Sequence, residues 1–442
     1  MKDKILIIGG GVAGLSAAVN AIDQGLRPVI IEKNRYLGGR VRSFVAGDLQ
    51  RNIDNGQHVL SSAYEKTRWL LQKIGSLDKV YFQKNFETHF VRTPSEHLYF
   101  RAAFLPPPFH FFFPLLRHQA FTQIQFKDFW NFWQQSRLLS PAGLKELTIS
   151  QWLDKCGQGE KIRELLWKPL SLSILNTPPE SGSALLLQQA LQYSFIGSRK
   201  NSGLGIPRTW LSEIFADPAE NYIRQAGGEI HLLDTVQTIK PLQNDSLQLI
   251  TQKNSFEADQ VIAAIPPFSL CEILENSPLP ELNDLTAKLK KFDYHPIMTI
   301  NIFCRQPLEF TFPISCVSSP VQWIFAHPQS GDDHSYALVV SAADQWMERS
   351  REEVMEMVEA ELLRLLGVDL QKENQILCYK IIKEKRATIA QTPHSLTLRP
   401  ETRTALKNFI LAGDWTSTGL PATIEGAIRS GITAIDAILS NS

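Results

Sequence analysis

Three glycines near the N-terminus have the spacing that holds the phosphates of a dinucleotide. Gly9, Gly11 and Gly14 form the pattern Gly-x-Gly-x-x-Gly and follow directly on an apolar run at residues 4–8. In this pattern the first glycine permits a tight turn, the second lets the backbone approach a pyrophosphate, and the third lets a helix pack closely on a strand. The sequence therefore predicts a phosphate-binding loop between a buried strand and a helix.

The elements around this loop complete a dinucleotide-binding unit. We expect Val12 and Ala13 to open the helix, whose N-terminal amides and dipole would bind the phosphates. A second apolar run at residues 28–32 ends on Glu32, at the spacing expected for an acid that binds a ribose hydroxyl. Glu32 in that role favours an unphosphorylated ribose, and Lys33 beside it is included among the predicted cofactor-binding residues.

A second motif follows the acid at once. Gly38 and Gly39 allow a close backbone approach, and Arg40 and Arg42 can bridge phosphate oxygens. A nicotinamide dinucleotide needs only the first glycine loop, whereas a flavin held along its whole length commonly needs further segments. This motif therefore favours FAD.

A segment near the C-terminus supplies a further piece of such a site. The apolar run at residues 409–411 leads into Gly413 and Asp414, and a helix is expected to open within residues 421–431. We interpret the two ends of the chain as parts of one FAD site.

The motif at residues 38–43 resembles the glycine-arginine motif of flavin amine oxidases, protoporphyrinogen oxidases and phytoene desaturases. Three further segments narrow this resemblance, at residues 54–60, 167–180 and 418–426. They are similar to the squalene-associated FAD enzymes, the hydroxysqualene dehydroxylases. The match extends along the whole chain.

The resemblance implies roles for residues outside the glycine loops. In the family, the aspartate at the position of Asp414 lies near the flavin ribityl and pyrophosphate, the backbone that opens the following helix lies at the flavin ring, and a valine backbone at position 236 contacts the adenine. The residues implied to bind FAD in this way are Gly56, Gln57, His58, Val236, Gly413, Asp414, Ala422, Thr423 and Ile424.

The expected fold class is α/β, with a Rossmann-like FAD-binding domain of the glutathione-reductase type and an interleaved α+β substrate domain. The FAD-binding domain is expected to be discontinuous, over residues 1–65, 201–267 and 386–442. The substrate domain would take residues 66–200, mostly helical, and 268–385. A chain of 442 residues with 43% apolar content can bury cores of this size.

The resemblance implies reductive dehydroxylation of an apolar isoprenoid such as hydroxysqualene, with hydride from reduced flavin. Such a site needs an acid to protonate the departing hydroxyl. Asp54 and His58 are the best candidates, and Glu425 is a third. Each also has a structural interpretation: Asp54 can belong to an ordinary turn, His58 can pack beside the ring, and Glu425 can favour a helix N-terminus electrostatically.

Other functions stay open from the sequence. An oxidative desaturase of the phytoene desaturase type would use the same fold and cofactor with hydride running to FAD, and fold does not decide direction. A flavin amine oxidase fits less well with the abundance of phenylalanine and the lack of acidic bias. A non-catalytic flavoprotein is disfavoured because every cofactor motif is intact. The sequence does not identify an electron donor for the flavin.

The composition and the N-terminal sequence argue against several kinds of partner and cellular compartment. The 45 basic and 45 acidic residues give a formal charge of zero, so we expect no nucleic acid partner. Five scattered cysteines form no metal-like pair, so no metal is expected, and they favour a reducing compartment. The first strand begins within a few residues of the N-terminus, which favours the cytoplasm over export.

The segment at residues 102–133 is dense in phenylalanine and tryptophan but broken by prolines. Its most apolar stretch, residues 102–116, is too short and too broken by prolines to span a bilayer. Two interpretations stay open: an entrance facing the cytoplasmic side of a membrane, which would make the protein peripheral, or an aromatic core under the substrate domain.

Overall fold

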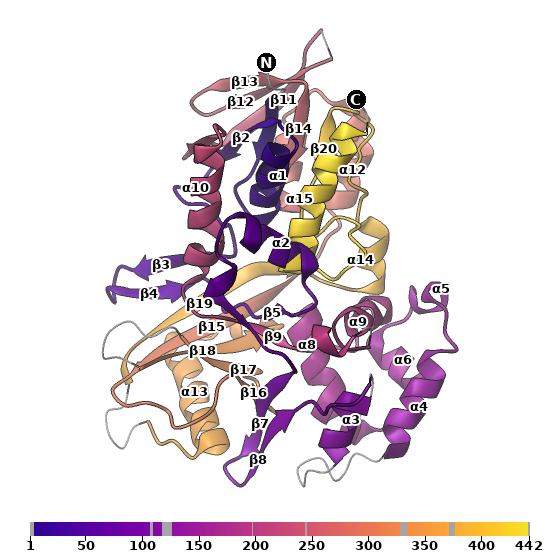
Figure 1. Ribbon diagram of the computed structural model, residues 1–442, viewed down its shortest axis with the longest axis vertical. Coiled ribbons are helices and arrows are strands. Elements are labelled where there is room, and N and C mark those ends of the chain that lie inside the picture. Colours follow the sequence, from indigo (N-terminus) through magenta and orange to yellow (C-terminus); the bar gives the residue numbers. More distant parts are fainter. Residues whose placement is uncertain are drawn as a thin grey trace.

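The computed structural model has two parts that lie end to end (Figure 1). A parallel sheet and its helices form the upper part in this view, and a larger mixed sheet with a helical layer forms the lower part. The structure describes residues 4–106, 109–116, 126–196, 198–243, 245–327, 334–370 and 376–440.

The upper sheet is parallel and has the strand order β10-β2-β1-β14-β20. Ile7 of β1 lies opposite Ile30 of β2 and Ile262 of β14, and all three are fully buried. Short apolar runs of this kind are typical of parallel strands covered on both faces. The expected α/β fold is confirmed. The strands are β1 (Lys4–Ile8), β2 (Arg27–Glu32), β10 (Glu229–Leu232), β14 (Gln260–Ala263) and β20 (Phe409–Leu411).

The first and last long helices pack side by side on one face of this sheet. They are α1 (Val12–Asp23) and α15 (Ile424–Leu439). A Cβ on Gly431 would lie 2.2 Å from the Ala13 carbonyl oxygen, so only glycine allows this approach. The Ser16 hydroxyl also donates to the Ile428 carbonyl at 3.1 Å.

The opposite face of the sheet is covered by a small antiparallel sheet and two helices. Leu6 and Val29 point to this side and share an apolar core with Leu249 and Leu270. The covering elements are β11 (Val236–Pro241), β12 (Leu247–Thr251), β13 (Ser255–Ala258), α11 (Pro267–Glu275) and α12 (Asn283–Leu289).

The lower sheet has the order β19-β15-β18-β17-β16-β7-β8. Alternate residues of β15, such as Met298 and Ile300, pack on α13 (Arg351–Leu366). Thr299 and Asn301 therefore point to the other face, toward the upper part. The strands are β7 (Glu87–Thr93), β8 (Glu96–Arg101), β15 (Tyr294–Cys304), β16 (Ile314–Cys316), β17 (Trp323–Ala326), β18 (His334–Ser341) and β19 (Ile376–Ile389).

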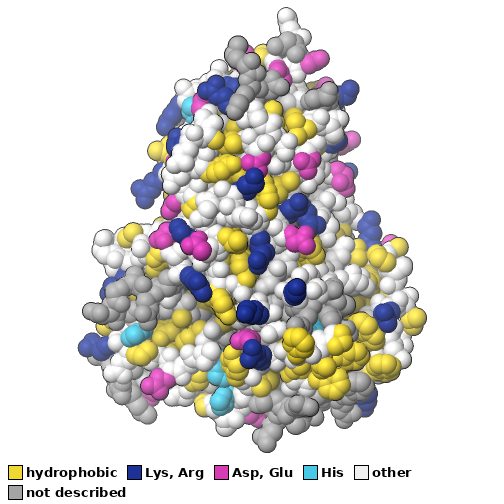
Figure 2. All heavy atoms as spheres, viewed as in Figure 1, with side chains coloured by type: hydrophobic (Ala, Val, Ile, Leu, Met, Phe, Trp, Pro, Cys, Tyr) yellow, Lys and Arg dark blue, Asp and Glu magenta, His cyan; other side chains and the backbone are white. Residues whose placement is uncertain are grey.

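The segment at residues 66–200, expected to be mostly helical, also supplies β7 and β8 to this sheet. Its helices form an apolar layer around Trp152 and Trp167, and Figure 2 shows apolar side chains gathered with Lys and Arg on the outside of that layer. Among the described residues, no helix is long and apolar enough to cross a membrane. The helices are α3 (Phe109–Leu116), α4 (Phe126–Ser136), α5 (Pro141–Leu144), α6 (Ile149–Lys155), α7 (Glu160–Ile162), α8 (Lys168–Leu175) and α9 (Ala184–Leu191).

Smaller elements connect the two parts. The connecting strands are β3 (Ser43–Ala46) paired with β4 (Arg51–Asp54), and β5 (Leu60–Ser61) with β9 (Leu204–Pro207) and β6 (Val80–Phe82). The remaining helices are α2 (Glu65–Lys73), α10 (Asp217–Gln225) and α14 (Pro393–Leu398).

Two buried amide side chains fasten the helical layer to the rest. Asn176 ends α8 in the left-handed conformation, and its Nδ2 donates to the His295 carbonyl at 3.2 Å. Its Oδ1 accepts the Ala342 amide at 2.7 Å. Gln391 donates to the Leu175 carbonyl at 2.8 Å and accepts the Ala422 amide at 2.7 Å. Asn176, within the segment at residues 167–180, therefore has a structural role, because it holds the end of α8 to the lower sheet.

Candidate functional site

The glycine loop between β1 and α1 has the geometry of an anion-binding turn. Gly9 has a φ of +104°, and a Cβ on Gly14 would lie 2.0 Å from the Gly9 carbonyl oxygen. A Cβ on Gly11, in contrast, would meet no protein atom within 4 Å. Gly11 is the N-cap of α1, and no side chain caps this helix. The loop thus keeps both space and backbone donors for a phosphate.

Glu32 is buried at the end of β2 and is held by the loop. Its Oε2 accepts the Gly10 amide at 2.7 Å, and its Oε1 accepts the Asn34 amide at 2.8 Å. The Asp234 amide donates to the Glu32 carbonyl at 3.1 Å, which brings the start of β11 and Val236 to this end of the site. Lys33 is exposed. The roles predicted for Lys33 and Val236 stay predictions.

The second motif lies directly on the first. The Gly38 amide donates to the Gly10 carbonyl at 2.8 Å, and a Cβ on Gly39 would lie 3.3 Å from the Gly11 Cα. Both Gly38 and Gly39 have positive φ angles, of +92° and +61°, which favour glycine. The second motif is thereby fixed beside the first loop.

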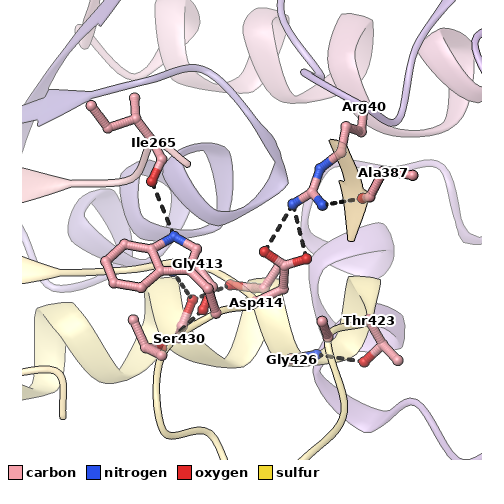
Figure 3. A network of polar contacts seen from close by, with 12 residues as sticks. Arg40, Ile265, Ala387, Gly413, Asp414, Thr423, Gly426 and Ser430 are labelled. Carbon is pink, nitrogen blue, oxygen red and sulfur yellow. Dashed lines mark hydrogen bonds and ion pairs between the residues drawn. The ribbon is translucent and has the colours of Figure 1, made fainter. Parts of the chain in front are cut away.

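Arg40 joins the second motif to the C-terminal segment (Figure 3). Its Nη2 lies 2.8 and 2.9 Å from the two carboxylate oxygens of Asp414, and its Nη1 donates to the Ala387 carbonyl at 2.6 Å. The Asp414 carboxylate raises the pKa of Arg40, so this guanidinium stays charged. The neighbouring Gly413 amide donates to the Ser430 hydroxyl at 2.7 Å.

Arg399, which carries no sequence motif, shapes the same loop. It is buried, and burial lowers its pKa to about 10. Its side chain donates to the carbonyls of Asp414 at 2.6 Å and Thr416 at 3.0 Å. Only the fold reveals this role, because no local spacing relates Arg399 to Asp414.

The start of α15 is well defined. Thr423 caps the helix by accepting the Gly426 amide at 3.2 Å (Figure 3). The carboxylate of Glu425 is occupied by the start of α2, because it accepts the amides of Lys66 at 3.0 Å and Thr67 at 2.8 Å. Glu425 is therefore a poor candidate for the proton donor. The Tyr193 hydroxyl also donates to it at 3.2 Å. Glu425 therefore caps α2 and has a structural role.

Asp54 is buried at the end of β4. Its Oδ1 accepts the Ser43 hydroxyl at 2.5 Å and the Leu211 amide at 3.1 Å. Its Oδ2 has no hydrogen-bond partner among the described residues. Burial raises the pKa of Asp54 to about 6, although both hydrogen bonds oppose this change. A carboxyl of this kind can carry a proton near neutral pH.

The loop after Asp54 contains Gly56, Gln57 and His58, and its Gly56 lies against β15. A Cβ on Gly56 would lie 3.7 Å from the Thr299 hydroxyl oxygen. His58 Nδ1 lies 2.8 Å from the Gly56 carbonyl, and burial lowers the pKa of His58, with the charge of Arg40 acting in the same direction. The neutral form of His58 is favoured, so Asp54 is the better proton donor of the two.

The loops around Gly11, Gly38 and Gly413 come together at the carboxyl edge of the parallel sheet, where α/β folds bind ligands. The open space at Gly11 and the uncapped α1 fit a pyrophosphate. The fold and this site define an FAD-dependent oxidoreductase of the Rossmann type.

Comparison with known proteins supports this assignment to the FAD-dependent oxidoreductases. Residues 12–439 match the family of flavin-containing amine oxidoreductases, and the chain belongs to this family. Hydroxysqualene dehydroxylases of Sinorhizobium fredii and Zymomonas mobilis are 27% and 28% identical to it, over 100% and 99% of this chain and 99% of each relative. The resemblance inferred from the sequence motifs is confirmed.

More distant relatives share the fold. The 15-cis-phytoene desaturase of Glycine max is 24% identical over 99% of this chain and 80% of the relative. The solved structure of a putrescine oxidase bound to putrescine has a TM-score of 0.75 and 17% identity, and covers 100% of this chain and 99% of that one. The latter likeness establishes the fold alone.

Replacement of Gly11 with valine tests where the pyrophosphate lies. Because a Cβ at this position would meet no protein atom within 4 Å, we expect Gly11→Val to fold but to lose its flavin. The ratio of flavin to protein absorbance after purification measures this loss.

Gly159→Val is a matched control. Gly159 is also a helix N-cap, with φ −73° and ψ 168° against φ −72° and ψ 174° at Gly11, and it too has open space at its Cβ position. This variant should keep its flavin. Full flavin content in Gly11→Val would contradict the placement.

Proposed function

We propose that the protein removes the hydroxyl group of hydroxysqualene to give squalene, as an FAD-dependent oxidoreductase of isoprenoid lipids. The observation that carries this proposal is the full-length similarity to three hydroxysqualene dehydroxylases, at 26–28% identity and 99% of each relative. The phytoene desaturases are 22–24% identical, and 78–80% of their length is covered.

The proposed reaction needs a proton as well as two electrons. Reduced FAD, when bound, would supply the two electrons as a hydride to the carbon that loses the hydroxyl. The C–O bond would break, and the hydroxyl would need a proton in order to leave as water. Among the residues of the protein, Asp54 is the candidate donor of this proton. Its Oδ2 is buried with no hydrogen-bond partner among the described residues, and its raised pKa makes the acid form accessible near neutral pH.

The substrate-facing side of the lower sheet suits a long hydrocarbon. Trp323 and Phe325 stack with ring centroids 5.7 Å apart on the same face of β17. Aromatic faces attract cations, so such surroundings also tolerate the positive charge that develops as an allylic hydroxyl departs.

An anaerobic single turnover tests the reaction and its direction. The flavin of the purified enzyme is reduced chemically, hydroxysqualene is added, and flavin reoxidation and product mass are followed together. We expect one equivalent of squalene for each flavin reoxidised.

Two controls sharpen this experiment. Squalene in place of hydroxysqualene should leave the flavin reduced, because it has no hydroxyl to lose. Persistent reduced flavin with unchanged hydroxysqualene, in folded holoenzyme, would reject the dehydroxylation and favour the oxidative desaturase.

Replacement of Asp54 tests the proton donor. Asp54→Asn should keep its flavin and slow the single turnover by about 10²- to 10⁴-fold, the usual contribution of a general acid. In the unaltered enzyme kcat/KM should fall as the pH rises through about 6, because the protonated carboxyl is the active form.

Asp48→Asn is the control for this change. Asp48 lies in the same hairpin but is exposed and pairs with Lys380 at 2.7 Å. Its replacement should leave both the rate and the pH profile unchanged. An undiminished rate in Asp54→Asn would remove Asp54 from the mechanism.

We also propose that the outer side of α3 and α4 contacts a lipid surface, from which so apolar a substrate would enter. Phe104 is 85% exposed, Phe113 42% and Trp130 43%. A groove of 420 Å³ between β8 and α3 is lined by apolar side chains, among them Leu105 and Phe113. Arg101 lies at the same groove and pairs with Glu87 at 3.0 Å.

Residues 102–133 have a buried part and an exposed part. Phe111 belongs to the aromatic core, with its ring centroid 4.9 Å from that of Phe86 and 5.0 Å from that of Phe195. Phe104 and Phe113 face outward. Residues 107–108 and 117–125 lie outside the described residues.

A triple variant tests the lipid contact. Phe104→Ser, Phe113→Ser and Trp130→Ser together should reduce co-sedimentation with vesicles that contain anionic lipid, at unchanged flavin content. The control triple Val45→Ser, Leu363→Ser and Leu377→Ser removes exposed apolar side chains elsewhere and should bind vesicles normally. Equal binding by both would contradict the proposal.

A further inference from the structure

Asp54 belongs to a closed circuit of contacts that joins the two parts of the molecule. Its carboxylate accepts the Leu211 amide, and the adjacent Trp210 lies against His327 with ring centroids 5.3 Å apart. His327 Nε2 lies 2.8 Å from Asn301 Oδ1.

From Asn301 the contacts continue along β15 back to the loop after Asp54. Thr299 and Asn301 lie on one face of this strand, two residues apart. Thr299 lies against Gly56, as the 3.7 Å separation from a Cβ there indicates, and Gly56 follows Asp54 by two residues. The loop after Asp54, the Trp210–Leu211 segment and the face of β15 thus surround one region.

Three buried polar atoms in this circuit have no hydrogen-bond partner among the described residues. They are Asp54 Oδ2, Gln57 Oε1 and His327 Nδ1. Buried polar atoms are rarely left without a partner, so several in one region indicate a ligand group. Gln57 Oε1 is an acceptor, His327 Nδ1 is an acceptor when it carries no proton, and Asp54 Oδ2 can donate when the carboxyl is protonated.

The protonation of His327 follows from its neighbour. Asn301 Nδ2 donates to the Lys380 carbonyl at 3.4 Å, which directs the Oδ1 of this amide toward the imidazole. His327 Nε2 must then donate, and Nδ1 presents a lone pair. The ring is 5% exposed, and burial lowers the pKa of His327 to about 4, so the imidazole is neutral at physiological pH.

We propose that His327 Nδ1 accepts a hydrogen bond from the hydroxyl of the substrate, with Asn301 and Trp210 as positioning residues that fix the imidazole ring. This inference rests on the proposed function, because it assigns the hydroxyl of that substrate. A hydroxyl offers one donor and two lone pairs. With its hydrogen held by His327, its lone pairs remain for the proton of Asp54.

This arrangement gives the site a means to distinguish an alcohol from a hydrocarbon. A hydrocarbon of the same shape would leave His327 Nδ1 buried without a partner, which costs free energy. The substrate alcohol would therefore bind more tightly than the product hydrocarbon, and loss of the hydroxyl would favour release.

A binding titration of the oxidised holoenzyme tests the inference without requiring turnover. Hydroxysqualene and squalene are titrated separately, and the change in flavin absorbance gives each Kd. His327→Phe keeps an aromatic ring against Trp210 but has no nitrogen. We expect it to weaken hydroxysqualene binding roughly tenfold, the loss of one buried hydrogen bond, and to leave squalene binding unchanged.

Two further variants separate this role from a structural one. His327→Gln offers an amide oxygen as acceptor and should recover part of the preference for the alcohol. His89→Phe alters another buried histidine of the same sheet, paired with His97 at 3.1 Å, and should leave both affinities unchanged.

The outcomes are distinguishable. Equal weakening of both ligands, an unchanged preference for the alcohol, or loss of flavin in His327→Phe would each overturn the inference, the last because it would assign Nδ1 to the cofactor. A preference for the alcohol that depends on His327, in an enzyme that does not turn over hydroxysqualene, would support the inference and reject the proposed reaction.

Discussion

The close packing of α1 on α15 is the contact on which the site depends. Gly431 admits the Ala13 carbonyl because it has no side chain, and the Ser16 hydroxyl fastens the pair through Ile428. Both helices follow parallel strands of one sheet, so both begin at its carboxyl edge. Two helix dipoles thereby direct their positive ends to one place, which suits an anionic cofactor. A larger residue at 431 would separate the two halves of the cofactor site.

Specific contacts between buried groups also join the upper part of the molecule to the lower part. Gln391 contacts both the end of α8 and the residue before the cap of α15, and Asn176 contacts three segments around the lower sheet. Each is a buried amide with both its donor and its acceptor satisfied. Hydrogen bonds of this kind fix a geometry more strictly than apolar packing does, because an incorrect register leaves a polar group unsatisfied. The position of the lower sheet relative to α15 is set in this way.

The sequence predicts those parts of the site that depend on local spacing. Local sequence patterns could predict the glycine loop, Glu32 and the Gly413-Asp414 pair. A strand, a turn and a helix N-terminus each require particular residue types at neighbouring positions in the chain. The positions of Arg399 and His327 in the site could not be predicted from the sequence, because no fixed spacing along the chain relates either residue to its hydrogen-bond partners. The Phe-rich segment was ambiguous for another reason, because both a buried core and an exposed lipid contact would select phenylalanine. Only the fold shows that Phe111 packs in a core and that Phe113 is partly exposed.

The order in which the parallel sheet is assembled has a consequence for biosynthesis. Its central strand is among the first residues translated, whereas β20 and α15 are among the last. At 5–20 residues per second, roughly 20 to 80 s separate Gly9 from Gly413 on the ribosome. A chain that ends before Gly413 therefore lacks part of the cradle, so we expect the flavin to bind only after the C-terminal motif has been translated. The yellow colour of a preparation then reports that translation has continued as far as the start of α15.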